Sequence, residues 1–282
     1  ARALARVCLI ALGALLLPAV ASAACATYRT VCASSCDYTT ISAAVGAIPS
    51  SPLTGDWCID IADNGVYSEQ VTVQGKNTAG YRIVIGTETG ATRPAVIPPA
   101  GSTAAFRIMN SSVVIAGLQV VAYAGSTVPY GIWASSAYVT ISSVSVSTVG
   151  PNGLGFSLAG IRVSSRSVVE YSSVSVNVAH GIWLDASSMT TVRYSTALVN
   201  STSGDYAVYL LQASSNTLLD VYAQNRVGDA LRLSGAGYNV LTGVRTFTDA
   251  TSRFSLGLVS GSSSNTVTLS VLETGPAEGY AL

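Results

Sequence analysis

A short apolar strand pattern recurs through most of the chain, and this repeat limits the possible folds more than any other feature. The first residues of successive copies are separated by 26, 29, 21, 26 and 23 positions. Self-similarity at a spacing of roughly 20 to 50 residues is typical of solenoids, propellers and arrays. The copies are Phe106-Arg107-Ile108, Ile132-Trp133-Ala134, Ile161-Arg162-Val163, Ile182-Trp183-Leu184, Val208-Tyr209-Leu210 and Leu231-Arg232-Leu233.

A second strand position follows nine or ten residues after each copy, across a polar turn rich in Ser, Gly and Asn. These positions are Ile115, Ile141, Glu170, Val192, Leu218 and Leu241, and Glu170 is the one misfit. A single coil cannot bury its apolar side alone, so coils must stack with neighbouring strands roughly 4.8 Å apart. No leucine-rich frame recurs, and a propeller needs four strands in about 40 residues. The sequence predicts an all-β fold, a single-stranded right-handed parallel β-helix (solenoid).

Three asparagines, Asn216, Asn239 and Asn265, fall at the same turn position of successive coils. Stacked turn asparagines can hydrogen-bond to one another along the solenoid axis. We therefore assign them a structural role as an internal ladder.

Residues 1–23 have the pattern of a secretory signal peptide. Arg2 and Arg6 precede an apolar stretch, and Ala21-Ser22-Ala23 forms a small-residue cleavage site. The apolar stretch is short for a membrane span. The sequence predicts a secreted protein, extracellular or periplasmic, with no membrane span after signal cleavage.

Four cysteines follow the cleavage site: Cys25, Cys32, Cys36 and Cys58. In an exported chain they predict two disulfides, with three connectivities open. A zinc site is the alternative, but no histidine lies near them, so we expect no metal and no cofactor.

The predicted organisation is a signal peptide over residues 1–23, a disulfide-stapled N-terminal cap over 24–56 and a parallel β-helix over 57–282. Within the cap, Thr40 to Ile48 is expected to form a short capping helix that Pro49 stops. The segment Thr274–Leu282 has no obvious cap. We expect a partner, self-association or a continuation of the chain to cover that end, because an open coil exposes unpaired strand edges.

The 14 basic and 14 acidic side chains balance to a net charge of zero. Nucleic-acid-binding proteins carry basic patches that neutralise phosphates. Nucleic acid is therefore not expected as a partner.

The N-terminal part of this sequence resembles the opening of pectin methylesterases. The resemblance rests on residues 37–45 (DYTTISAAV), Pro49, 59–61 (IDI) and 65–73 (GVYSEQVTV). The later coils resemble the general right-handed β-helix repeat of periplasmic copper-site maturation and carbohydrate-processing proteins. The resemblance covers nearly the whole mature chain and implies membership of the pectin lyase-like superfamily, without specifying a chemistry.

The catalytic motifs of the known enzymes in this superfamily are not found in the chain. The three pectin methylesterase motifs and the acidic cluster of pectate lyases are missing. Ala179-His180-Gly181 resembles the Gly-His-Gly element of polygalacturonases, but Leu158-Ala159-Gly160 stands where that family has paired aspartates. Inverting glycoside hydrolysis needs two carboxyl groups, so the match fails as a catalytic assignment.

Alternation along a strand places the middle residue of each copy outside the solenoid. The resulting outward column consists of Arg107, Trp133, Arg162, Trp183, Tyr209 and Arg232. Arginine pairs with carboxylates and aromatic rings offer an apolar surface, so the column is a candidate binding strip for a polysaccharide, an acidic glycan being favoured. The structural alternative is that these side chains stack on one another through cation–π contacts or pack beneath the loop from Gly150 to Ala159.

A turn cluster precedes the same strands and contains His180, Asp205 and Asp229. A histidine and aspartates beside a groove could serve as general base and acid, which makes these three residues weak catalytic candidates. The structural alternative is ordinary turn chemistry, since each aspartate follows a glycine.

Three functions follow from these patterns. The chain is a secreted protein that binds extracellular polysaccharide, with or without processing it, a non-catalytic surface or adhesion spacer, or a divergent glycoside hydrolase or polysaccharide lyase. The sequence alone does not decide whether it is an enzyme.

Overall fold

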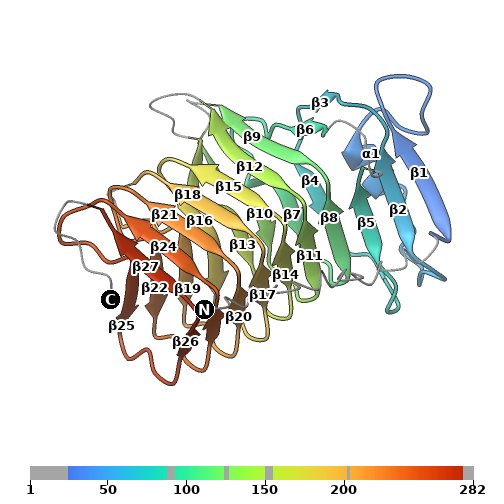
Figure 1. Cartoon of the computed structure of the whole chain (residues 1–282). Coiled ribbons are helices and arrows are strands. Elements are labelled where there is room, and N and C mark those ends of the chain that lie inside the picture. Colours follow the sequence, from blue (N-terminus) through green and yellow to red (C-terminus); the bar gives the residue numbers. More distant parts are fainter. Residues whose placement is uncertain (1–24, 88–92, 124–126, 150–154, 202–203, 276–282) are drawn as a thin grey trace, which may run out of the picture.

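The computed structural model describes residues 25–87, 93–123, 127–149, 155–201 and 204–275, and Figure 1 shows them as a solenoid of stacked coils. About nine coils succeed one another along the axis, and their strands form three parallel sheets of ten, eight and nine strands. The fold is the predicted right-handed parallel β-helix. The predicted signal peptide, residues 1–23, lies outside the described residues. Within the described ranges, no helix has the length and apolarity that a membrane crossing requires.

Each complete coil gives one strand to each sheet in turn. The ten-stranded sheet contains β1 (Thr27–Val31), β2 (Trp57–Ile61), β5 (Ile83–Gly86), β8 (Val113–Ala116), β11 (Val139–Ser142), β14 (Val168–Glu170), β17 (Thr191–Arg193), β20 (Thr217–Leu219), β23 (Val240–Thr242) and β26 (Thr266–Thr268). The nine-stranded sheet contains β3 (Val66–Tyr67), β6 (Ala95–Val96), β9 (Gln119–Tyr123), β12 (Ser145–Val149), β15 (Ser173–Val176), β18 (Thr196–Val199), β21 (Tyr222–Asn225), β24 (Arg245–Thr248) and β27 (Val271–Thr274). The eight-stranded sheet contains β4 (Val71–Val73), β7 (Ala104–Ile108), β10 (Val128–Ala134), β13 (Phe156–Val163), β16 (His180–Asp185), β19 (Val208–Leu211), β22 (Leu231–Ser234) and β25 (Leu256–Val259).

The sequence repeat reveals two of these three strands in each coil. The apolar copies lie in the eight-stranded sheet and the second positions in the ten-stranded sheet, whereas the nine-stranded sheet was not predicted. Its strands have few large apolar residues: β15 reads SVSV, and the buried column passes from Val174 to Ala197 and Ala223. Small inward residues weaken the alternation that marks a strand.

The apparent misfit at Glu170 is a register error of one residue. Val169, not Glu170, pairs with Ile141 and Val192 and is completely buried. Counted between paired residues, the polar turn before β14 is one residue shorter than the turns before β8 and β11. A slip of one residue moves a side chain to the opposite face of a sheet. Glu170 therefore points outward, where its carboxylate lies 2.5 Å from the Arg193 guanidinium.

The predicted asparagine ladder is confirmed. The side-chain amide of Asn216 donates to the carbonyl oxygen of Asn239 at 3.0 Å, and the amide of Asn239 donates to Asn265 at 2.9 Å. Asn216 and Asn239 are buried. Because each amide also binds backbone of a neighbouring coil, the ladder satisfies polar groups inside the turn that water does not reach.

A capping helix over the whole of Thr40–Ile48 is not confirmed. The helical piece α1 spans Ile41–Gly46, fewer than two turns. The Thr40 hydroxyl accepts from Ala43 N–H, and the Glu69 carboxylate accepts from the N–H groups of Ile41 and Ser42. The piece packs against β1, β2 and β4.

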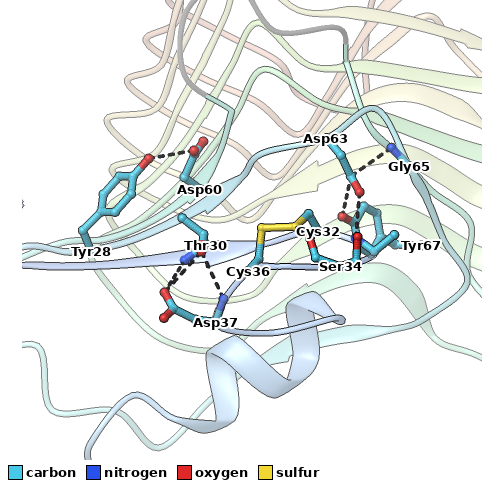
Figure 2. The surroundings of a disulfide bond; sticks show 11 residues. Tyr28, Thr30, Cys32, Ser34, Cys36, Asp37, Asp60, Asp63, Gly65 and Tyr67 are labelled. Carbon is cyan, nitrogen blue, oxygen red and sulfur yellow. Dashed lines mark hydrogen bonds between the residues drawn. A yellow bond between two sulfur atoms is a disulfide. The ribbon is translucent and has the colours of Figure 1, made fainter.

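The four cysteines form two disulfides, Cys25–Cys58 and Cys32–Cys36. The first joins the residues just before β1 to β2, and these two strands pair in parallel. The second closes a short loop after β1, where Figure 2 shows it between two aspartates that each bind backbone N–H groups. Asp37 accepts from Thr30 N–H, and Asp63 accepts from the N–H groups of Ala33 and Gly65.

The last described coil exposes residues that face the interior elsewhere. Val267 pairs with the completely buried Leu241 yet is 38% exposed, and Leu258 pairs with the completely buried Leu233 yet is 42% exposed. The predicted partner or self-association at this end stays a prediction, and residues 276–282 of the segment concerned lie outside the described residues.

The two disulfides should contribute unequally to stability. Cys25–Cys58 joins residues 33 positions apart and Cys32–Cys36 residues 4 positions apart. Loop-closure entropy predicts a loss of about 4 kcal/mol when the first pair is replaced by serines and about 2 kcal/mol for the second. Denaturant unfolding of the two double variants measures both losses, and a greater loss from the Cys32/Cys36 pair contradicts the assignment.

Candidate functional site

The outward column lies in register along the eight-stranded sheet. Trp133 pairs with Arg107 on one side and Arg162 on the other, and the pairing continues from Arg162 to Trp183, Tyr209 and Arg232. Each step is one coil, roughly 4.8 Å. Positions 21 to 29 residues apart in the sequence are therefore immediate neighbours.

Alternation sets the direction of these side chains. Ile182 and Leu184 are completely buried, whereas Trp183 between them is partly exposed. The same pattern of buried, partly exposed and buried residues holds at Phe106-Arg107-Ile108 and Leu231-Arg232-Leu233. In each of these strands two apolar side chains point into the core. Because successive side chains alternate, the residue between those two points outward.

Cations and aromatic rings alternate from Arg107 to Trp183 in this column and stack on one another. The guanidinium of Arg107 lies 5.5 Å from the ring centre of Trp133, and that of Arg162 lies 5.9 Å from the same ring. Arg162 also lies 4.6 Å from the ring centre of Trp183, which stacks on Tyr209 at 6.1 Å. The column thus makes the cation–π contacts that were predicted as the structural alternative to ligand binding. The rings turn their faces toward neighbouring coils.

Two of the three arginines are paired with carboxylates. Arg162 forms an ion pair with Asp185 and donates to the Tyr130 hydroxyl at 2.9 Å. Arg232 forms an ion pair with Asp229 at 3.0 Å. In the described part of the chain, no carboxylate partner is found for Arg107.

A small open pocket of about 130 Å³ lies beside the Arg162–Asp185 pair. Its lining consists of Trp133, Ala134, Ser135, Arg162, Val163, Ser164 and Asp185. The pocket thus combines guanidinium donors, a carboxylate acceptor, two serines and the side of an indole ring. This set can bind a compact molecule rich in hydroxyl groups.

Sequence reasoning missed Asp185 as a member of this site. It lies two residues after Trp183 on the outer face of β16, and one coil from Arg162. A charge at a strand end looks like an ordinary turn residue. Its position two residues from an outward tryptophan was the available signal, because residues i and i+2 share a face.

The turn cluster brings His180 and Asp205 together. His180 Nδ1 lies 3.6 Å from an Asp205 carboxylate oxygen and accepts a hydrogen bond from Tyr206 N–H at 3.1 Å. The ring stacks almost parallel on Tyr206, with ring centres 5.3 Å apart. Burial lowers the pKa of His180 to about 4, although the Asp205 charge acts in the opposite direction.

This geometry limits the chemistry of His180 at neutral pH. Since Nδ1 accepts from a backbone N–H, the proton of the neutral ring sits on Nε2. The ring then has no free acceptor nitrogen for a general base, and Nδ1 has no proton to donate to Asp205. A histidine with this arrangement serves packing and hydrogen bonding.

Asp229 is engaged by its own surroundings and is only 3% exposed. Its carboxylate accepts from Phe254 N–H at 3.0 Å and pairs with Arg232. Asp205 accepts from the Ser201 hydroxyl at 2.7 Å. These contacts give the two aspartates structural tasks, and the catalytic role of the cluster stays a hypothesis.

His180 should remain neutral down to about pH 4, because burial disfavours the charged ring. Its pKa is lower in the folded state than unfolded, so its contribution to stability is complete above about pH 6.5 and is lost as the pH falls toward about 4. It is the one histidine of the chain, so its ring proton signal in NMR is unambiguous. A titration midpoint near 6.5 in the folded protein contradicts the buried position.

Comparison with known proteins identifies the family. The model of the family described as "Periplasmic copper-binding protein (NosD)" matches residues 103–272, more than half of the chain. The chain belongs to the NosD family. No curated protein matches it at a significant level. Among solved structures, the pectin methylesterase from Aspergillus niger in deglycosylated form is similar at 13% identity and a TM-score of 0.38, covering 85% of this chain and 86% of that one.

The NosD description names copper, and a copper site requires ligands of the kinds that copper prefers. Copper sites in proteins use thiolate, thioether and imidazole ligands. In the described ranges all four cysteines form disulfides, and the single imidazole is buried against Tyr206. The two thioethers of those ranges, Met109 and Met189, lie three coils apart. Those ranges hold no group of three or more His, Cys, Asp or Glu that could bind a metal ion. The described residues therefore do not fit a copper site.

Proposed function

We propose that this NosD-family protein binds an extracellular polysaccharide along the outward column, with the pocket beside Arg162 and Asp185 as its centre. The observation that carries the proposal is this pocket, which brings a guanidinium and a carboxylate together beside Trp133. Sugar rings present hydroxyl groups that donate and accept at once. A paired arginine and aspartate offer the complementary donors and acceptors.

The bound glycan contacts polar groups and ring edges. The faces of Trp133 and Trp183 already stack with the Arg162 guanidinium, so they do not form an open platform. The stacked arginine retains N–H groups beyond those given to Asp185 and Tyr130, because a guanidinium has five donors. Stacking also holds the column rigid, which lowers the entropy lost on binding.

The proposed location is the periplasm or the extracellular space. A family described as periplasmic and two disulfides fit an exported protein. The signal peptide over residues 1–23 is part of this proposal and rests on the sequence pattern.

Two other functions remain as alternatives. A surface or adhesion spacer would use the solenoid as a stiff rod and would have no affinity for sugars. A glycoside hydrolase or polysaccharide lyase would need a base, and His180 presents no free acceptor nitrogen at neutral pH. Binding is therefore favoured over catalysis.

Replacing both Trp133 and Trp183 by alanine should weaken glycan binding at least about tenfold. The double change removes the wall of the pocket and frees the Arg162 side chain that the two rings hold. A glycan array on the wild-type protein identifies the ligand, and calorimetric titration with that ligand compares the variants. A tenfold change corresponds to about 1.4 kcal/mol.

The matched control is the double variant Tyr171→Ala with Tyr194→Ala. These two rings also stack across neighbouring coils, with centres 5.1 Å apart, but lie outside the outward column. Wild-type affinity is expected in this variant. Equal loss in both double variants, or an array without any bound glycan, overturns the proposal.

A further inference from the structure

The three arginines of the outward column differ in how their charge is balanced. Asp185 neutralises Arg162 and Asp229 neutralises Arg232. Arg107 pairs in register with Thr72 and Trp133, which carry no charge. Within the described ranges, Arg107 is therefore the one cation of the column without a carboxylate beside it.

The surroundings of Arg107 fix the position of its guanidinium and leave it able to bind an anion. The group lies over the Trp133 ring, which fixes its position without supplying a counter-charge. The Arg107 residue is partly exposed although its Nε atom is buried, so the terminal nitrogens of the guanidinium are the donors that an incoming group can reach. A stacked guanidinium is weakly hydrated and matches the two oxygens of a carboxylate. An incoming carboxylate thus gains a charge-assisted contact, and the guanidinium loses little hydration when it forms.

We infer that Arg107 is the subsite for the carboxylate of a uronic acid, whereas the pocket beside Arg162 and Asp185 takes a neutral ring by its hydroxyl groups. This inference rests on the proposed glycan binding. The two positions are two coils apart, roughly 10 Å along the axis. A glycan that runs along the column can fill both with sugars of one chain.

The different preferences of the Arg107 subsite and the Arg162 pocket follow from the charges beside each arginine. At Arg162 an added carboxylate meets Asp185 as well as the guanidinium, so attraction and repulsion oppose each other. At Arg107 attraction acts alone. Specificity for acidic glycans therefore depends on one residue, even though the column contains three arginines.

The test compares each acidic ligand with its carboxyl-reduced form. The probes are tetragalacturonate and tetramannuronate, each beside its reduced neutral counterpart, together with the best array ligand. Titration calorimetry is run on the wild type, Arg107→Gln and Arg107→Lys. The wild type should bind the acidic form about tenfold more tightly than the reduced form. Arg107→Gln should abolish this difference with little change for the neutral form, and Arg107→Lys should restore part of it.

Arg166→Gln is the matched control. The Arg166 guanidinium also lies over a ring, 5.5 Å from the centre of Tyr138, but outside the outward column. This variant should keep the full preference for the acidic form. If the wild type binds both forms equally, or Arg107→Gln weakens both forms alike, the assignment of Arg107 fails while glycan binding stands. If the array and all four probes show no binding, the proposed function fails and the subsite with it.

Discussion

Parallel hydrogen bonding of each coil onto the previous one is the interaction on which this structure depends. A coil has only a few inward residues, and these are buried only between neighbouring coils. The column of Ile115, Ile141 and Val169 is completely buried because the strands that carry them pair in register. A slip of one residue would turn all three outward. The register is therefore fixed by the core, and everything on the surface follows from it.

The same register that stacks the core stacks the surface. Arginine and tryptophan alternate from Arg107 to Trp183, so the Arg162 guanidinium lies between the rings of Trp133 and Trp183. Such contacts each contribute about 0.5–1 kcal/mol at exposed positions. They stiffen the column, but they also cover the ring faces that a ligand could otherwise contact. Asp185 and Asp229 then balance two of the three positive charges. Structural stacking and ligand binding are therefore compatible uses of one column, because stacking occupies the ring faces and leaves polar groups at its side.

Strong alternation made much of this arrangement predictable from the sequence. Apolar and turn residues recur at matching positions, and this recurrence predicts two strands per coil, the outward column and the asparagine ladder. The nine-stranded sheet was not predictable in this way, because some of its inward residues are as small as Ala197 and Ala223. The disulfide pairing needed the distances between Cα atoms, 5.8 Å for Cys25–Cys58 and 5.5 Å for Cys32–Cys36. The contacts of His180 and Asp185 depend on neighbours one coil away, which local patterns do not specify.

The register itself can be tested by engineered disulfides on the outer face of the eight-stranded sheet. Leu211 and Ser234 are register partners, so their Cα atoms lie within the range of about 4.4–6.8 Å that a disulfide spans. Leu211 and Val259 are two coils apart, roughly 10 Å. The double variant Leu211→Cys with Ser234→Cys should form a disulfide in air, and Leu211→Cys with Val259→Cys should not, as mass spectrometry of peptides will detect. No disulfide in the first variant, or equal formation in both, contradicts the stacking on which the site is built.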